Sequence, residues 1–213
     1  DGLWLSGRVI WDKEAIKLLN EKNTVYICDG DVVAANLSSD VGAKWHATRE
    51  FNSINNENIS SIEINVKKCN YLWDIIRFIP ITILEESLQL VPIDVSSFKD
   101  VIIMESEKVF VSNSQLLPNV VINAQNGPVI IESNVIIGSQ SYIEGPAFVG
   151  NGTVVTPLAK IKKCVIGPNC RIGGEVESSI IQGFSNKVHD GHLGDSYLGE
   201  WVNFGAGTSN SNL

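Results

Sequence analysis

A six-residue repeat of aliphatic residues dominates the second half of this 213-residue chain. A period of six fits neither an amphipathic helix, whose side chains repeat every 3.6 residues, nor a simple alternating strand. It predicts a parallel β-helix, in which three hexads close one triangular coil. The aliphatic residue of each hexad then points inward, and the small residue that often follows it lets the backbone turn a corner. The repeat runs through Ile131, Ile137, Ile143, Val149, Val155 and Ile161.

The repeat continues with small slips to Ile166, Ile172, Leu193 and Leu198. A sandwich of short strands is the alternative fold, but it rarely keeps a strict six-residue period. Charged residues thin out from about residue 109, and helical periodicity ends there. We therefore expect two domains, an α/β segment over 1–108 and a β-helix over 109–213 whose pattern stops abruptly, as in a truncated chain.

The first segment mixes helical and strand patterns. An Asp-Gly-Asp sequence at 29–31 predicts a turn between two strands, and Asp12 is a candidate helix N-cap. Pro80 is expected to end or kink a helix. The expected elements are strands within 3–11 and 23–38, helices within 12–22 and 71–79, and a loop at 51–61.

Composition narrows the class of protein. The net charge of -8 argues against nucleic acid as a partner, and no apolar stretch approaches the length of a membrane span. The first residues show no signal-peptide pattern and no initiator Met, which suggests a piece of a longer protein. The four cysteines form no C-x-x-C pair, so we expect reduced thiols in a cytoplasmic protein rather than a metal site or a disulfide.

The segment "SNKVHDGHLGDS", residues 185–196, interrupts the repeat, because Lys187 stands where an aliphatic residue is due. Burial of an unpaired lysine costs several kcal/mol, so we expect the backbone to leave the coil here as a polar loop. His189 is a candidate general base, with Asp190 and Asp195 as orienting carboxylates or turn formers. A surface histidine is the plain alternative. A metal site is not expected, since the third histidine, His46, lies far away in the sequence.

Two stretches in the second half of the chain resemble a known family. The stretches "GPVIIESNVIIG" and "IGPNCRIGGEVESSIIQGFSNKVHDGHLGDSYLGEWVNFGAGTSNSNL" are similar to the bacterial N-acetylglucosamine-1-phosphate uridylyltransferase/glucosamine-1-phosphate acetyltransferase family, and most to its divergent sugar nucleotidyltransferase branch. The resemblance covers roughly residues 118–213. It implies a left-handed β-helix, and "SGRVI" and "YLWDII" resemble the last part of a nucleotidyltransferase domain.

The resemblance implies an acyltransferase that moves an acetyl or other acyl group from acyl-CoA to a sugar. The family's catalytic histidine falls on His189, and its nearby tyrosine falls on His192, in the acceptor pocket. Two family asparagines that hold the sugar and polarise the thioester fall on Asn203 and Asn212. Backbone N–H groups of Gly205, Ala206 and Gly207 would stabilise the thioester oxyanion.

The family's phosphate-binding lysine has no match here, because that region carries Glu175 and Glu177. Lys187 is a candidate replacement, with Asp190 as a further substrate contact. Lys160 and Lys162 are candidates for the phosphates of coenzyme A, and a solvated basic surface is an equal alternative. Residues 1–117 lack the glycine-rich loop that cradles nucleotide phosphates, so Mg²⁺ is expected only if that missing half exists elsewhere.

Three hypotheses follow. The first is a homotrimeric acyltransferase that acts on a small-molecule sugar in grooves between neighbouring β-helices. The second is a non-catalytic β-helix that trimerises and regulates a sugar-1-phosphate nucleotidyltransferase. The third is a nucleotidyltransferase whose catalytic half lies outside this chain.

Overall fold

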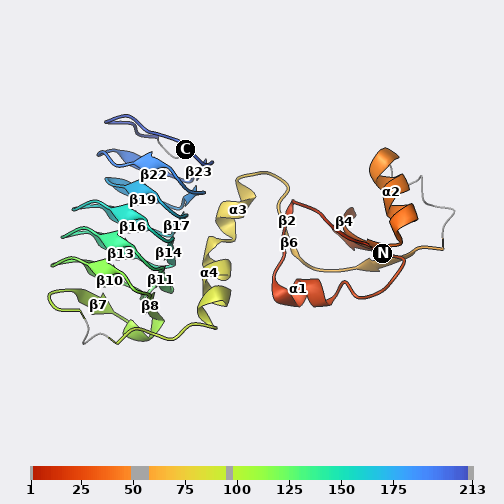
Figure 1. The fold of residues 1–213 in the computed structure, drawn as a ribbon, viewed down its shortest axis with the longest axis horizontal. Coiled ribbons are helices and arrows are strands. Elements are labelled where there is room, and N and C mark those ends of the chain that lie inside the picture. Colours follow the sequence, from red (N-terminus) through yellow and green to blue (C-terminus); the bar gives the residue numbers. More distant parts are fainter. Residues whose placement is uncertain (1, 49–57, 95–97, 211–213) are drawn as a thin grey trace. The chain divides into compact units, whose positions relative to one another are not determined.

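The structure is a computed structural model that describes all residues except 1, 49–57, 95–97 and 211–213. The chain divides into two compact units, Asp1–Tyr71 and Leu72–Leu213. The first contains a small sheet with helices, and the second contains a stack of β-helix coils with two helices beside it (Figure 1).

The first unit is an α/β fold on a four-stranded sheet. Its elements are β1 (Gly2–Leu5), β2 (Val9–Ile10), α1 (Lys13–Lys17), β3 (Thr24–Cys28), β4 (Asp31–Leu37), α2 (Ser39–Thr48), β5 (Ser60–Glu63) and β6 (Lys67–Lys68). The sheet order is β1-β4-β3-β5, in which β3 and β5 are parallel and the other pairs antiparallel. β2 and β6 form a separate antiparallel pair.

Most sequence expectations for this unit are confirmed. β3 and β4 form the predicted hairpin, whose turn holds Asp29 and Gly30 at positive φ. The predicted helix starts after Asp12 but ends at Lys17, earlier than expected. The expected loop at 51–61 was wrong at its end, where Ser60 and Ser61 belong to β5, and residues 51–57 lie outside the described residues.

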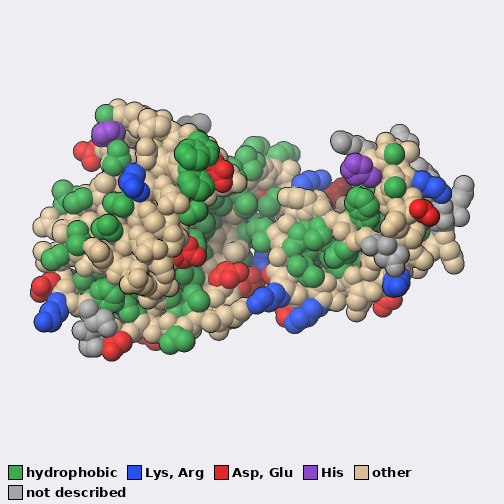
Figure 2. Space-filling view, in the orientation of Figure 1, with side chains coloured by type: hydrophobic (Ala, Val, Ile, Leu, Met, Phe, Trp, Pro, Cys, Tyr) green, Lys and Arg blue, Asp and Glu red, His purple; other side chains and the backbone are tan. Residues whose placement is uncertain are grey.

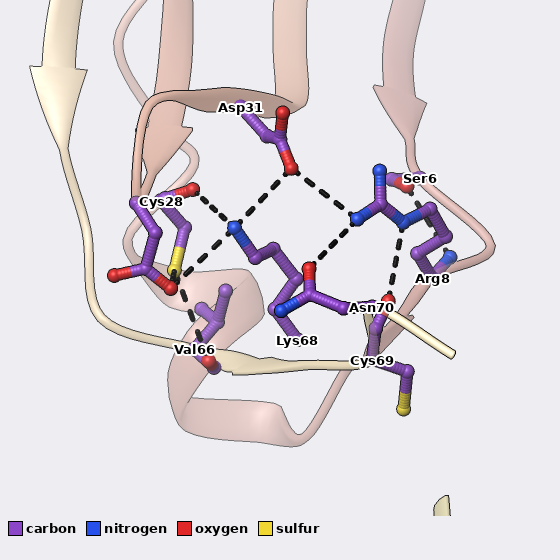
Figure 3. A network of polar contacts seen from close by, with 9 residues as sticks. Ser6, Arg8, Cys28, Asp31, Val66, Lys68, Cys69 and Asn70 are labelled. Atoms are coloured by element: carbon purple, nitrogen blue, oxygen red, sulfur yellow. Dashed lines mark hydrogen bonds and ion pairs between the residues drawn. The ribbon is translucent and has the colours of Figure 1, made fainter. Parts of the chain in front are cut away.

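A polar network around Lys68 joins β6 to the β3–β4 hairpin (Figure 3). The side chain of Lys68 is 5% exposed, and its Nζ donates to the Cys28 carbonyl at 2.9 Å and to Asp31 Oδ2 at 3.2 Å. Arg8 reaches the same carboxylate at 3.3 Å and donates to Asn70 Oδ1 at 2.9 Å. The buried ammonium is therefore paired, and the network links β6 to the hairpin and to Arg8.

Asp12 caps α1 and gives a pH-dependent stability prediction. Its carboxylate accepts from Lys67 Nζ at 2.7 Å and from the Ala15 N–H at 2.8 Å, and these contacts hold its pKa below the usual value. Replacing Asp12 by Ala should lower the free energy of unfolding by about 1–2 kcal/mol at pH 7. Because the folded pKa is lowered, that difference should shrink as the pH falls through it. Urea denaturation at several pH values between 7 and 2 measures both the loss of unfolding free energy at pH 7 and its decrease at lower pH.

The exposed Glu21 supplies the control, since Glu21→Ala should change the free energy of unfolding by less than about 0.5 kcal/mol. A pH-independent loss for Asp12→Ala would contradict the assigned role of the carboxylate.

The second unit begins with two short helices, α3 (Asp74–Arg77) and α4 (Ile79–Ser87). Pro80 breaks the helical run as expected, but it lies in the first turn of α4, where its missing N–H has no partner to lose. The continuation of helix after the proline was not predicted. Ile76, Ile79 and Ile83 pack on Phe110 and Ile130 of the β-helix. Among the described residues, no helix is long and apolar enough to span a membrane.

The β-helix consists of three parallel sheets that share about five coils, and it matches the left-handed class that the resemblance implies. The first sheet contains β7 (Ile102–Met104), β10 (Val121–Asn123), β13 (Tyr142–Glu144), β16 (Lys160–Lys162), β19 (Glu175–Glu177) and β22 (His192–Gly194). The second contains β8 (Val109–Val111), β11 (Val129–Ile131), β14 (Ala147–Val149), β17 (Val165–Ile166), β20 (Ile180–Ile181) and β23 (Tyr197–Leu198). The third contains β9 (Gln115–Leu116), β12 (Ile136–Ile137), β15 (Val154–Val155), β18 (Arg171–Ile172) and β21 (Asn186–Lys187).

The six-residue repeat forms the core of the β-helix, as predicted. From Ile131 to Ile172 its aliphatic residues are at most 1% exposed, and they stack in register, for example Ile143 beside Ile161 and Val149 beside Ile166. The small residues at the corners are required because the backbone of the next coil lies against them. A Cβ on Gly167 would lie 2.0 Å from the Gln182 carbonyl oxygen of the next coil. Successive coils therefore approach too closely there for any side chain.

The predicted boundary at 108/109 marks the change in residue pattern and remains a prediction about domains. The two compact units divide earlier, after Tyr71, and the first β-helix strand, β7, begins at Ile102.

The core gives a second stability prediction. Replacing Ile161 by Ala should lower the free energy of unfolding by about 2–5 kcal/mol, because it opens a cavity in a fully buried column. Leu158, 67% exposed at the neighbouring corner, is the matched control, and Leu158→Ala should cost less than about 0.5 kcal/mol. Chemical denaturation measures the free energy of unfolding of both variants. An equal loss in Ile161→Ala and Leu158→Ala would contradict the assigned inward direction of the repeat.

Candidate functional site

Lys187 corrects the main structural expectation for residues 185–196. The backbone does not leave the coil, because Asn186 and Lys187 form β21 and pair with Arg171 and Ile172 of β18. The Lys187 side chain points inward, in the column that Ile172 occupies one coil below, and it is 2% exposed. The prediction of an outward loop was wrong because it assumed that a buried lysine would have no partner.

Two backbone carbonyls supply that partner. Lys187 Nζ donates to the His189 carbonyl at 2.7 Å and to the Gly173 carbonyl at 3.1 Å. Burial lowers the pKa of this ammonium, and the negative charge of Asp190 opposes that effect. An ammonium with two carbonyl acceptors is far less costly to bury than an unpaired one.

The short corner of the preceding coil, between β18 and β19, explains how the lysine fits. Residues 188–191 connect β21 to β22, whereas only Gly173 and Gly174 connect β18 to β19. A Cβ on Gly174 would lie 2.9 Å from both Lys187 Nζ and the His189 carbonyl oxygen. The short glycine corner thus leaves the space that the end of the lysine fills.

His189 and Asp190 lie exposed on the 188–191 corner, between the third and first sheets. Among the described residues, the imidazole of His189 has no hydrogen-bond partner. Histidine and acidic side chains lie on the surface at the end of the β-helix that β22 and β23 form (Figure 2). His192 is the first residue of β22, opposite Glu175 of β19.

The glycine-rich turn lies on the same corner, one coil further on. A Cβ on Gly191 would lie 2.3 Å from the Thr208 carbonyl oxygen, which brings the 205–208 turn directly over the 188–191 corner. Gly205, Ala206 and Gly207 are exposed. Asn203 is also exposed and pairs with Asn186 of β21. The predicted residues His189, Asp190 and 205–207 therefore lie on the same corner in neighbouring coils, and Asn203 precedes the turn.

Other predicted residues lie apart from this corner or outside the described part. Lys160 and Lys162 lie on β16 of the first sheet, directly opposite Glu175 and Glu177 of β19. Their positive charges therefore face carboxylates across the strand pair. Asn212 lies outside the described residues.

Two residues near the corner were not predicted. The N–H of His192 donates to Ser209 Oγ at 3.0 Å. The amide of Asn210 accepts from the Gly194 N–H at 2.8 Å and donates to the Gly194 carbonyl at 2.7 Å. These side chains continue the hydrogen bonding of β22 where the chain is no longer a strand. The polar run "TSNSNL" was the available signal.

The buried thiols offer little reactive chemistry. Burial raises the pKa of Cys164 to about 12, so this thiol stays protonated at neutral pH. Within the described part of the chain, no group of three histidine, cysteine or acidic side chains is arranged to hold a metal ion.

No protein-family model matches the chain. Curated proteins that carry the name bifunctional protein GlmU match parts of the chain. The relative from Rippkaea orientalis is 43% identical over 67 residues, which cover 30% of this chain and 15% of the relative. Those from Nostoc sp. and Wigglesworthia glossinidia brevipalpis are 32% identical over 119 residues and 37% identical over 110 residues.

The Nostoc match covers 46% of this chain and 26% of the relative, and the Wigglesworthia match covers 50% and 22%. The chain thus spans about a quarter or less of the relatives it matches. These matches and the hexapeptide β-helix confirm the predicted resemblance of this chain to the bifunctional GlmU proteins.

Proposed function

We propose that the β-helix transfers an acyl group, acetyl in the simplest case, from acyl-CoA to an amino or hydroxyl group of a sugar. The similarity to GlmU proteins and the β-helix fold support a transferase of the sugar-nucleotide pathway. The observation that carries the proposal is the shared corner, where His189 lies one coil away from the glycine-rich turn at 205–208.

His189 acts as the general base in this proposal. Its exposed imidazole removes the proton from the attacking amine or hydroxyl as that group adds to the thioester carbonyl. The tetrahedral intermediate then collapses, the C–S bond breaks, and the protonated His189 returns the proton to the sulfur, so that coenzyme A leaves as the thiol. Backbone N–H groups of the Gly205–Ala206–Gly207 turn stabilise the oxyanion, because glycine lets the substrate approach the backbone closely.

His192 and Asn203, which both follow His189 along the chain, hold the acceptor in this proposal. Asn212 would join them, and Lys160 and Lys162 would meet the phosphates of coenzyme A. His189, Asn203 and residues 205–207 are exposed, which supports a site completed by a second copy in a homotrimer.

A second candidate function is a non-catalytic β-helix that assembles a nucleotidyltransferase. The inward direction of Lys187 favours it, since this lysine is not free to grip an acceptor phosphate and Glu175 lies near the same corner. Within the acyltransferase proposal, the same observation favours an acceptor bound through uncharged groups.

Replacing His189 by Gln tests the proposal. The full-length protein should release coenzyme A from acetyl-CoA with at least one member of a panel of amino and hydroxy sugars, their phosphates and their nucleotides. Loss of the base should lower kcat by about 10²–10⁴-fold. The matched control is His46→Gln, in α2 of the other unit, which should leave turnover unchanged.

Unchanged turnover in His189→Gln would overturn the base assignment. A wild-type protein that forms trimers but releases no coenzyme A with any member of the panel would favour the second candidate.

A further inference from the structure

We infer that Lys187 is a positioning residue that fixes, from inside the β-helix, the corner that carries His189. This inference rests on the proposed function, because it assigns the lysine a role in placing the proposed base.

The column that contains Lys187 shows that the lysine is an exception to an apolar pattern. The inward residues of the third sheet are Leu116, Ile137, Val155, Ile172 and Lys187, each in register with the next. Lys187 is as buried as its aliphatic neighbours, and its stem continues their packing. Only the end of the side chain differs, so its role must come from the amine.

The amine satisfies carbonyls that the backbone ladder leaves open. On one side of the corner the Gly173 N–H donates to the Lys187 carbonyl, and on the other the Glu175 N–H donates to the Gly191 carbonyl. Between them the upper corner has two more residues than the lower one, so the ladder cannot continue. Lys187 Nζ bridges this interval by donating to Gly173 below and His189 above.

An aliphatic residue cannot replace this bridge. Valine or isoleucine would leave both carbonyls without the donor, and each unsatisfied buried carbonyl would favour movement of the corner toward water. Methionine would fill the same space without donating. The lysine therefore selects one conformation of residues 188–191.

The placement of the imidazole depends on this backbone. The described residues provide no hydrogen bond to the His189 side chain, so the corner itself sets where the ring lies. A carbonyl fixed at 2.7 Å by a buried ammonium anchors the residue that would carry the base. A displacement of about 1 Å at a reacting group can cost a hundredfold in rate.

Lys187→Met tests the inference, since it keeps the length of the side chain and removes the donors. In the full-length protein, kcat for acyl transfer should fall by about tenfold to a hundredfold, while KM for acetyl-CoA should change less than twofold. In protein carrying ¹³C-labelled histidine, the His189 ring signal, assigned with His189→Gln, should move or broaden, and the His46 signal should not. The exposed Lys99→Met variant is the control and should change neither reading.

A folded Lys187→Met protein with unchanged kcat, or with lowered kcat and an unmoved His189 signal, would overturn the inference. If the wild-type protein transfers no acyl group, the proposed function fails, and the His189 signal still decides whether Lys187 holds the corner.

If Lys187→Met does not fold, the wild-type protein provides the test. The ammonium protons of Lys187 should exchange slowly enough with water to appear in a ¹H–¹⁵N spectrum, with nuclear Overhauser contacts to residues 173–174 and 189. An ammonium that exchanges as fast as that of Lys99 would overturn the inference.

Discussion

The parallel hydrogen-bond ladder between successive coils constrains everything else in the β-helix. It holds neighbouring strands at a fixed spacing, so each inward position must contain a side chain that packs on the one below, and each corner must avoid a clash with the next. Gly167 meets the second requirement, with no room for a Cβ beneath Gln182. The aliphatic repeat meets the first.

The ladder also explains why the region around His189 differs from the rest. Backbone groups of two neighbouring corners can pair residue by residue only where the corners have equal numbers of residues, and the Gly173–Gly174 corner is shorter than the one above it. Polar backbone atoms that would otherwise pair with the next coil are then left open inside the molecule. Lys187 resolves this by placing a charged donor where the repeat predicts a methyl group. The same unequal corner displays His189 and Asp190 at the surface.

The fold was predictable because its periodicity is local. A six-residue repeat needs no knowledge of distant contacts, and it correctly predicted the core from Ile131 to Ile161. The candidate site was only partly predictable. The direction of Lys187 depends on a corner in another coil, although the short spacing between Ile172 and Val176 was a visible sign of it. The carboxylates opposite Lys160 and Lys162 depend on coil length, which no single hexad reveals.

Measuring the accessibility of each lysine amine tests most directly the claim that residues 185–196 remain in the coil with Lys187 inside. Native protein would be treated briefly with an amine-reactive reagent, and labelling at each lysine would be read by peptide mass spectrometry. We predict that Lys187 reacts as slowly as the buried Lys68, that the exposed Lys99 reacts fast, and that all three react alike after denaturation. Labelling of Lys187 in native protein at the rate of Lys99 would contradict this account.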